Sequence, residues 1–406
     1  MSLGDMARRN SKRNQKNQGS SPVRPARGIA EKTKILLAVA AGGRCQFQGC
    51  NEYLFEHPLT LKDGNYSELA HIVAFSEDGP RGRSGKRPRD INSVANLMLL
   101  CQKDHKCIDD SPDEFSRAIL EQYKADHEER IRHVTGLGPD MRTSVVQFKA
   151  LIGGDAVEIP ASQIYEAVAP RYPTDKRGCV IDLTAVPTDD DAFITTARGT
   201  IRREVEGLYR PGMDVEKTRH ISLFALGPIP LLAYLGSQLS NKITVDMYQR
   251  HRDSSKPSPW QWREGGPRAA YRVRLLKNGP SKKSAALILS LSGSVHRTDL
   301  PSLSALRNAP IYEVRLASED PNVHFLRKRE DLEAFRKTYR NLLSRLMRER
   351  PGIRELHVFP AVPAPVGVAL GHDLLPKVHP ALLVYDRDKK KGGFTLRIKV
   401  NDYDER

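Results

Sequence analysis

Two stretches of 34 residues in the C-terminal half of the chain are similar to each other. Residues 220–253 align with residues 355–388 without a gap, at a constant offset of 135 positions. The identical pairs include Phe224/Phe359, Pro230/Pro365, Gly236/Gly371 and Leu239/Leu374. Chance matches do not usually keep register over such a length, so the pattern indicates an internal duplication.

Each copy has the pattern of a strand, a proline-containing turn, a helix and a second strand. From about residue 178 onward, apolar runs rich in β-branched residues alternate with helical patterns. This alternation is typical of parallel sheets flanked by helices. The sequence therefore predicts an α/β domain built from two similar halves.

Ligands of open parallel sheets bind beyond the carboxyl ends of the strands. In the two copies this place is the turn after the first strand, which makes Gly227, Pro228, Val362 and Pro363 candidate ligand contacts.

Both tryptophans of the chain, Trp260 and Trp262, lie in a segment rich in Gly and Pro and are followed by Arg263. The rings can stack on a nucleotide base and the guanidinium can meet a phosphate. Equally, the two rings can cap the core or form an oligomer interface. Further candidates on an expected helix are Arg198, Arg202 and Arg203, which a solvated helix face explains as well.

The charge balance favours polyanions as partners. The 406 residues include 65 Lys and Arg against 49 Asp and Glu, a formal net charge of +16. No apolar run is long enough to span a membrane, and the N-terminus lacks the apolar run of a signal peptide, so we expect a cytoplasmic protein without a membrane partner. Residues 1–27 are rich in Lys and Arg and are expected to form a disordered basic tail.

Four of the five cysteines, Cys45, Cys50, Cys101 and Cys107, fall close together in the N-terminal part. A sparse, odd number of cysteines argues against a disulfide framework, and clustered thiols in a reducing compartment indicate metal. Cys45, Cys50 and Cys101, with a fourth ligand from Cys107 or Asp104, would close a tetrahedral structural Zn²⁺ site. The alternative is a set of buried thiols in a small core.

The same segment contains His71 in a short strand-like run, Asn96 in a loop and His105 near a helix start. This layout suits metal-assisted hydrolysis of a phosphodiester, which needs a base for the attacking water and a cation for the developing charge. His71 suits the base, because its ordinary pKa is near neutrality. His105, helped by Glu68 or Asp109, suits a divalent metal, and Asn96 can hold the loop and the imidazole in place.

A basic loop separates the two histidines. Its cations are Arg81, Arg83, Lys86, Arg87 and Arg89. Beside a nuclease centre they would contact phosphates of DNA on either side of the scissile bond. A solvated basic loop is the alternative.

The order of these residues, with Ala-His-Ile, Gly-Pro-Arg, Asn-Leu-x-x-Leu-Cys and His-x-x-Ile-Asp, resembles the HNH endonucleases of the ββα-metal type over roughly residues 29–135. The resemblance implies that His71 is the general base, Asn96 the orienting amide and His105 a ligand of a catalytic Mg²⁺ or Mn²⁺. The chain departs from many relatives at Ala70, where they carry His or Asp. Its cysteine spacing also differs from their two Cys-x2-Cys pairs.

An HNH module followed by a duplicated α/β domain resembles the HNH–SAVED effectors of bacterial cyclic-oligonucleotide antiphage signalling. SAVED domains in turn resemble two fused CARF-like, Rossmann-like units. The resemblance implies an endonuclease of double-stranded DNA that a cyclic di- or trinucleotide activates by driving homo-oligomer assembly, from dimer to tetramer. Two alternatives remain: an HNH restriction-type enzyme whose C-terminal domain recognises DNA, and a non-catalytic, zinc-containing nucleic-acid-binding adaptor.

The expected organisation is a nuclease module at 28–135, a linker and hairpin at 136–160 and a sensor domain at 161–406. Helices are predicted at 29–41, where the apolar residues Ile35, Leu36, Val39 and Ala40 recur at helical spacing, and at 112–134. Alternating apolar residues predict the hairpin over 145–159.

Overall fold

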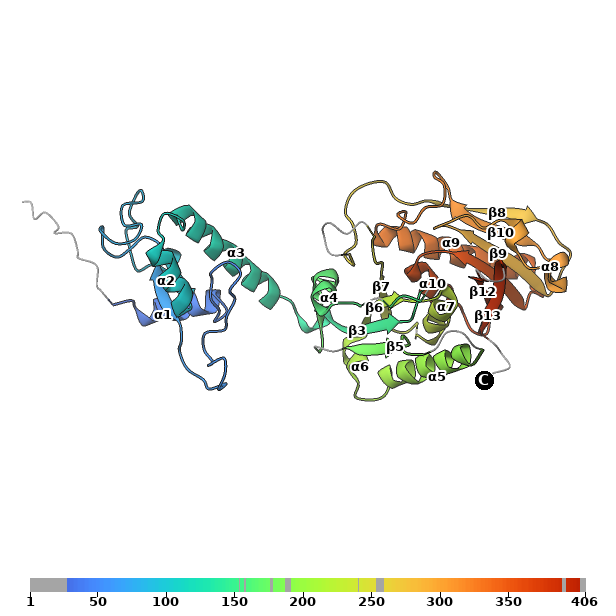
Figure 1. Ribbon diagram of the computed structural model, residues 1–406, viewed down its shortest axis with the longest axis horizontal. Coiled ribbons are helices and arrows are strands. Elements are labelled where there is room, and N and C mark those ends of the chain that lie inside the picture. Colours follow the sequence, from blue (N-terminus) through green and yellow to red (C-terminus); the bar gives the residue numbers. More distant parts are fainter. Residues whose placement is uncertain are drawn as a thin grey trace, which may run out of the picture. The chain divides into compact units, whose positions relative to one another are not determined.

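The computed structural model describes residues 28–152, 154–156, 158–175, 178–186, 191–239, 241–252, 259–388 and 392–401. The chain divides into two compact units, Met1–Gly136 and Leu137–Arg406. Figure 1 shows both units with their helices and strands. The predicted basic tail lies outside the described residues.

The first unit is a small assembly of helices around one two-stranded sheet. Its elements are α1 (Glu31–Ala40), β1 (Glu68–His71), β2 (Leu97–Leu100), α2 (Gln102–Asp110) and α3 (Arg117–Thr135). The strands pair antiparallel, and every residue of β2 is buried. Cys101 caps α2, because its sulfur accepts a hydrogen bond from the backbone N–H of Asp104.

Both predicted helices of this unit exist, but their details differ from the prediction. On α1, Ile35, Leu36 and Val39 are exposed and Leu37 is fully buried, so the helix packs through a narrow contact on another face. The second predicted helix begins only at Arg117, where the Ser116 side chain accepts from a backbone N–H and caps it.

The second unit contains two sheets. The first half comprises β3 (Arg142–Lys149), α4 (Ala161–Val168), β4 (Tyr172–Pro173), β5 (Cys179–Asp182), α5 (Asp191–Leu208), α6 (Asp214–Thr218), β6 (His220–Leu226), α7 (Ile229–Gln238) and β7 (Thr244–Tyr248). The second half comprises β8 (Tyr271–Lys277), β9 (Ser284–Ser290), α8 (Ser304–Arg307), β10 (Ile311–Leu316), α9 (Arg329–Glu349), β11 (Glu355–Ala361), α10 (Ala364–His372), β12 (Ala381–Asp388) and β13 (Gly393–Val400).

The strand order confirms the predicted duplication and extends it beyond the aligned residues. In the first half the parallel order is β5-β3-β6-β7, and in the second it is β10-β9-β11-β12. Helix α5 precedes β6 as α9 precedes β11, and α7 corresponds to α10. Strands β8 and β13 are antiparallel additions at the edges of the second sheet. The unit is therefore the predicted pair of similar α/β halves.

The two halves meet where α7 packs against α10 (Figure 1). At this crossing lie the equivalent glycines Gly236 and Gly371. A Cβ atom on Gly236 would come within 2.0 Å of the Val368 carbonyl oxygen, and one on Gly371 within 1.8 Å of the Ala233 carbonyl oxygen. Only glycine permits so close an approach of the two backbones.

The predicted hairpin over 145–159 is wrong. Residues Arg142–Lys149 form β3, which pairs in parallel with β6, and beyond it only an isolated bridge joins Ile152 to Asp155. Strand β3 is buried over most of its length, so a place in the middle of the sheet removes more apolar surface from water than a local hairpin would. The segment belongs to the second unit.

Candidate functional site

Three short elements bring the predicted nuclease residues into one small unit. His71 ends β1, Asn96 ends a single 3₁₀ turn directly before β2, and His105 lies in the first turn of α2. This is the local placement that the sequence predicts: one histidine on a strand, an asparagine in a loop and a histidine at a helix start.

Asn96 is buried and closes the loop between the two strands. Its Oδ1 accepts from the backbone N–H of Val73 at 3.0 Å, and its Nδ2 donates to the carbonyl oxygens of Val73 at 3.0 Å and Ile91 at 2.9 Å. Three bonds fix both ends of the loop with one side chain. Asn96 therefore holds the loop, as expected, but these bonds go to the backbone and not to the imidazole.

A different amide, which the sequence analysis did not single out, holds the imidazole. Oδ1 of Asn92 lies 3.0 Å from Nε2 of His71. An oxygen acceptor at this position keeps the proton on Nε2 and leaves the lone pair of Nδ1 available, which a general base requires. The sequence offers two asparagines four positions apart, and their spacing does not indicate which one faces the histidine.

His105 lies between two carboxylates. Its Nε2 is 3.4 Å from Oδ2 of Asp109, and its Nδ1 is 3.8 Å from Oε2 of Glu68. Histidine ligands of metals commonly pass their second ring N–H to a carboxylate, which orients the ring. In this arrangement Asp109 orients the imidazole, while Nδ1 and Glu68 face the same space as candidate ligands. Mixed imidazole and oxygen donors that are open to solvent suit Mg²⁺ or Mn²⁺.

Arg81 does not have the predicted role of a DNA contact. Its side chain is buried, and its Nε and NH1 donate to the carbonyl oxygens of Ile72 at 2.8 Å and Ile108 at 2.6 Å. Its NH2 lies 3.2 Å from Oδ1 of Asp109. Burial lowers the pKa of Arg81, and the Asp109 carboxylate opposes that shift. The guanidinium thus ties the end of β1 to α2 and braces Asp109.

Arg87 is also engaged within the protein. Its guanidinium donates to three backbone carbonyl groups of loop 74–82, so its prediction as a phosphate contact is wrong as well. Arg83, Lys86 and Arg89 are exposed, with Arg83 paired to a neighbouring carboxylate. Two of the five basic residues therefore build the loop, and three face solvent.

A second cluster in the first unit can hold a metal ion. One ligand atom from each of Cys45, Cys50, Cys101 and Asp104 lies within 4.8 Å of the others. Asp104 is therefore the fourth member, and the alternative ligand Cys107 is wrong, because that side chain is exposed one turn further along α2.

The chemistry of this donor set fits Zn²⁺, for which thiolates and a carboxylate are suitable ligands. Burial raises the pKa of the Cys101 thiol to about 11 and raises that of Cys45 as well. For Asp104, burial would raise the pKa, but hydrogen bonds from the thiols outweigh it and lower the pKa. Oδ2 of Asp104 lies 3.1 Å from the Cys45 sulfur and 3.0 Å from the Cys101 sulfur. Buried thiols around an ionised carboxylate are the arrangement that a bound cation would convert to thiolates.

In the second unit, the two predicted turns occupy equivalent places. Pro228 follows β6 and caps α7, and Pro363 follows β11 and caps α10. Both turns lie at the carboxyl ends of parallel strands, as predicted. Gly227 and Val362 are buried, and the two prolines are partly exposed.

The predicted stacking surface is wrong for Trp260. This side chain is fully buried, and its ring lies 5.2 Å from that of Phe224 in an edge-on arrangement. Trp262 is half-buried against the same cluster, and Arg263 is buried. The aromatic segment therefore caps the core, which was the alternative interpretation for Trp260.

Two family models match the chain. The first describes an HNH endonuclease and matches residues 45–111. The second describes the "SMODS-associated and fused to various effectors sensor domain" (SAVED) and matches residues 201–400. No curated protein is similar enough to count as a match. Of the helices that the structure describes, none combines the length and apolar character needed to cross a membrane.

Solved structures of Cap4 SAVED/CARF-domain containing receptors are similar at low identity. The receptor of Acinetobacter baumannii with the cyclic trinucleotide 2'3'3'-cAAA is 12% identical, with a TM-score of 0.42, and the match covers 76% of this chain and 64% of that one. For the Moraxella osloensis receptor the identity is 10% and the TM-score 0.40, with 79% and 71% covered. The chain thus spans about two thirds of the length of these receptors.

Proposed function

Since the chain belongs to the HNH–SAVED effectors of bacterial cyclic-oligonucleotide antiphage signalling, we propose that it is a metal-dependent endonuclease of double-stranded DNA that a cyclic nucleotide switches on. The observation that carries this proposal is the presence, in one chain, of an HNH domain with both histidines oriented and a sensor domain of two like halves. The proposed substrate, DNA, and the proposed cyclic nucleotide messenger are both present in the bacterial cytoplasm, so we expect the protein to act there.

In the proposed reaction, Nδ1 of His71 takes the proton of the attacking water, and Asn92 holds the imidazole in the required tautomer. His105 and Glu68 would hold a divalent cation, with Asp109 orienting His105. Such a cation, when bound, stabilises charge on the phosphate and the leaving oxygen. Arg83, Lys86 and Arg89 are the exposed cations that we expect to contact phosphates of DNA on either side of the scissile bond.

The second metal site is proposed as structural Zn²⁺. Cys45 lies on the segment after α1, and Cys101 and Asp104 lie at the start of α2. A cation held by these residues would join the two segments and so support the α2 histidine. A unit with this little core gains a substantial part of its stability from such a site.

For the sensor domain, the duplication supports a small ligand with its own symmetry. In both halves the second strand is added on one side of the first strand and the third on the other side, so the order of connection switches at β3/β6 and at β9/β11. Ligands of such sheets bind at that crevice. The turns at Gly227-Pro228 and Val362-Pro363 lie there, so we propose a cyclic di- or trinucleotide in contact with them. Its binding is proposed to favour assembly from dimer to tetramer, because a ligand shifts an equilibrium only toward the state that it binds better.

The test uses the full-length protein and supercoiled plasmid in Mg²⁺, with and without a panel of cyclic di- and trinucleotides. At least one panel member should start cleavage, and EDTA should stop it. His71→Ala is the matched control: loss of a general base costs roughly 10²- to 10⁴-fold in rate. Light scattering on the same samples should show a larger mass when the activating nucleotide is present.

Cleavage without any nucleotide, at a rate that the panel does not change, would instead support the restriction-type enzyme. Absence of cleavage under every condition, with tight binding of DNA, would support the adaptor.

A further inference from the structure

A short arm projects from the first unit over residues 53–67. Backbone hydrogen bonds join its two limbs, from Tyr66 to Leu54 at 2.9 Å and from His57 to Lys62 at 2.9 Å. Leu54 is buried in the core of the unit, which anchors the base of the arm. Figure 1 shows the arm as a blue loop that projects from the unit.

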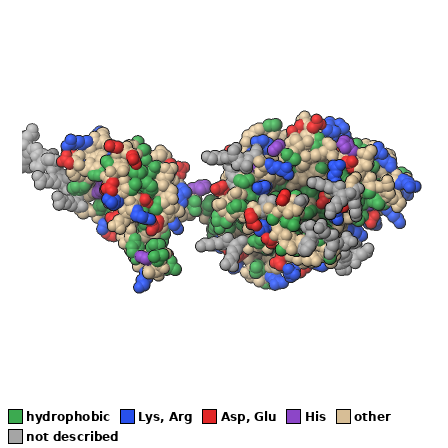
Figure 2. All heavy atoms as spheres, viewed as in Figure 1, with side chains coloured by type: hydrophobic (Ala, Val, Ile, Leu, Met, Phe, Trp, Pro, Cys, Tyr) green, Lys and Arg blue, Asp and Glu red, His purple; other side chains and the backbone are tan. Residues whose placement is uncertain are grey.

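The tip of the arm presents apolar side chains to solvent. Leu59 is 87% exposed and Leu61 is 68% exposed, and Pro58 beside them is exposed as well. Hydrophobic side chains gather at the end of this projection in Figure 2. Because removing such side chains from water is favourable, a tip that leaves them exposed is a candidate contact with another molecule.

Hydrogen bonds fix the tip in this conformation. Nδ1 of His57 accepts from the backbone N–H groups of Leu59 at 3.3 Å and Thr60 at 3.1 Å. The N–H of Leu61 donates to the His57 carbonyl oxygen at 2.9 Å, and Leu61 has a φ of 53°, which is uncommon for a leucine. The His57 ring also packs edge-on against Tyr66 at 5.6 Å. Since the turn is already ordered, a contact made by the leucines costs little conformational entropy.

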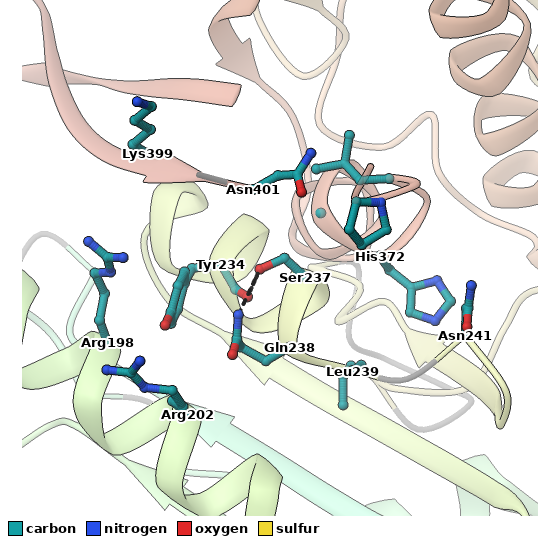
Figure 3. A pocket seen from close by; sticks show the side chains of 13 residues that line it. Arg198, Arg202, Tyr234, Ser237, Gln238, Leu239, Asn241, His372, Lys399 and Asn401 are labelled. Atoms are coloured by element: carbon teal, nitrogen blue, oxygen red, sulfur yellow. Dashed lines mark hydrogen bonds between the residues drawn. The ribbon is translucent and has the colours of Figure 1, made fainter. Parts of the chain in front are cut away.

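The polar groups of a cavity in the sensor domain, in contrast, are engaged with one another. This cavity of about 420 Å³ lies beside the ends of α7 and α10 (Figure 3). Arg198 lies over the Tyr234 ring at 5.1 Å, Gln238 donates to Ser237 at 3.2 Å, and Lys399 has a partner within the chain. The two tip leucines, however, belong to none of the hydrophobic clusters formed by the described residues.

The arm leads directly into the strand that carries a proposed metal ligand. Leu61 and Glu68 are seven positions apart, and a chain of that length spans at most about 25 Å. Because duplex DNA has one phosphate per strand every ~3.4 Å, the tip lies within about seven base pairs of a phosphate bound at Glu68. The formal net charge of +16 attracts DNA, and Lys62 is exposed beside the leucines to meet a phosphate.

Leucine and proline are among the side chains that DNA-bending proteins insert between base steps from the minor groove. We propose that the arm is a DNA wedge: Leu59 and Leu61 enter the minor groove of the duplex bound at the nuclease centre and unstack one base step. The inference rests on the proposed function, because it concerns the DNA substrate of that site. Pyrimidine–purine steps unstack most easily, so the wedge gives the enzyme a preference for cutting near such steps.

The test measures unstacking on the full-length His71→Ala protein, which leaves the DNA uncut, with and without the panel of cyclic nucleotides. The duplex has about 30 base pairs. Each of its strands is a run of pyrimidines followed by a run of purines, so it contains a single pyrimidine–purine step, marked with 2-aminopurine. In the control duplex the two runs are reversed and no such step exists. At saturating protein the fluorescence should rise about twofold on the first duplex and stay unchanged on the second.

Leu59→Ala/Leu61→Ala in the same background should abolish the rise, while duplex anisotropy shows an affinity within about tenfold, because phosphate contacts dominate binding. Ile35→Ala/Val39→Ala is the matched control, since it removes two exposed apolar side chains of the same unit. This variant should keep the rise.

A rise that persists in Leu59→Ala/Leu61→Ala, or no rise although the duplex is bound, would overturn the inference. An equal loss in both double variants would overturn it too, because exposed apolar surface in general would then be the cause. Plasmid cleavage by protein that retains His71 decides the proposed function separately. Cleavage without unstacking rejects the wedge alone, and unstacking without cleavage upholds the wedge and rejects the endonuclease. Absence of duplex binding would overturn both.

Discussion

Oδ1 of Asn92 lies 3.0 Å from Nε2 of His71. The second histidine of the centre is oriented through the same ring atom, because Oδ2 of Asp109 lies 3.4 Å from Nε2 of His105. In both imidazoles an oxygen fixes Nε2 and leaves Nδ1 available. In His71 this is the proposed base atom, and in His105 it is the proposed metal ligand. An amide beside the base and a carboxylate beside the metal ligand suit the two roles, since a carboxylate beside the base would favour its protonated form.

Asn92→Ala should lower kcat for plasmid cleavage about 10- to 100-fold with little change in KM, because the base remains but its orientation is lost. Asn92→Asp should move the acid limb of the pH–rate profile to higher pH, since the new carboxylate stabilises the imidazolium. Initial rates across the neutral range measure both effects. If both variants keep the profile and rate of the unaltered protein, Asn92 does not position His71.

Arg81→Ala should destabilise the first unit by about 3 kcal/mol, because a buried guanidinium with three partners is removed. Its effect on the salt dependence of DNA binding should be small. Lys86→Ala and Arg89→Ala should leave the free energy of unfolding unchanged. Each should reduce the dependence of DNA affinity on salt concentration by the amount expected for about one phosphate contact. Denaturant unfolding and duplex anisotropy in a His71→Ala background separate the two classes. An unchanged free energy of unfolding for Arg81→Ala would contradict the structural role assigned to the buried guanidinium.

Cys50→Ser should lose bound metal and thermal stability, whereas Cys107→Ser should keep both, because Cys107 is exposed and outside the cluster. Elemental analysis of protein purified without added metal should give about one zinc per chain for the unaltered protein and for Cys107→Ser. Zinc retained in Cys50→Ser, or absent from all three proteins, would argue for buried thiols without a metal.

Acid should loosen the contact between α3 and the segment after α1 through His127. Burial lowers the pKa of His127, although its bond to the Ala41 carbonyl oxygen at 2.9 Å opposes this shift. The unfolded chain therefore takes up a proton near pH 6.5 while the folded chain does not. The contribution to stability is present above that pH and is lost as the pH falls through the folded-state pKa.

Hydrogen exchange followed by mass spectrometry on peptides of α3 should show this loss of protection. His127 donates to the Ala41 carbonyl oxygen and accepts from the Arg130 guanidinium. His127→Gln can make both kinds of hydrogen bond without titrating, so its exchange should depend less on pH. Equal pH dependence in the two proteins would exclude His127 as the cause.

Gly371→Ala should destabilise the sensor domain by about 3 kcal/mol or more, because the new methyl group would meet the Ala233 carbonyl oxygen and force α7 and α10 apart. Gly199→Ala is the matched control. Gly199 lies within α5 with nothing within 4 Å of the added carbon, so this change should stabilise the protein by about 0.5–1 kcal/mol. Thermal unfolding of the full-length chain compares the two variants. Equal melting temperatures would contradict the claim that α7 and α10 approach too closely at Gly371 for a side chain.

Local pattern in the sequence was enough to predict the strand, loop and helix that position His71, Asn96 and His105, and to detect the duplication. It failed where long-range packing decides. Trp260 and Arg81 look like surface groups in their polar, Gly- and Pro-rich segments, yet each is buried by elements distant in sequence.

The same limit applies to the choice between near neighbours. Asn92 and Asn96, or Asp104 and Cys107, differ by a few positions, and only the folded geometry shows which member of each pair faces the site. The run over 145–159 was misassigned because alternation fits both a hairpin and a central strand, and the paired residues of β6 lie 77 positions further along the chain.

The close contact of α7 with α10 makes the sensor domain equivalent to a dimer whose two subunits are permanently tethered. In a true symmetric dimer, every change in one subunit is copied in the other. Tethering removes that restriction, and the two copies have diverged: Gln238 donates a hydrogen bond to its neighbour Ser237 at 3.2 Å, while its counterpart Asp373 forms an ion pair of 2.6 Å with Arg336. The glycines keep α7 and α10 in contact, so equivalent positions elsewhere in the two copies can carry different side chains and take different roles.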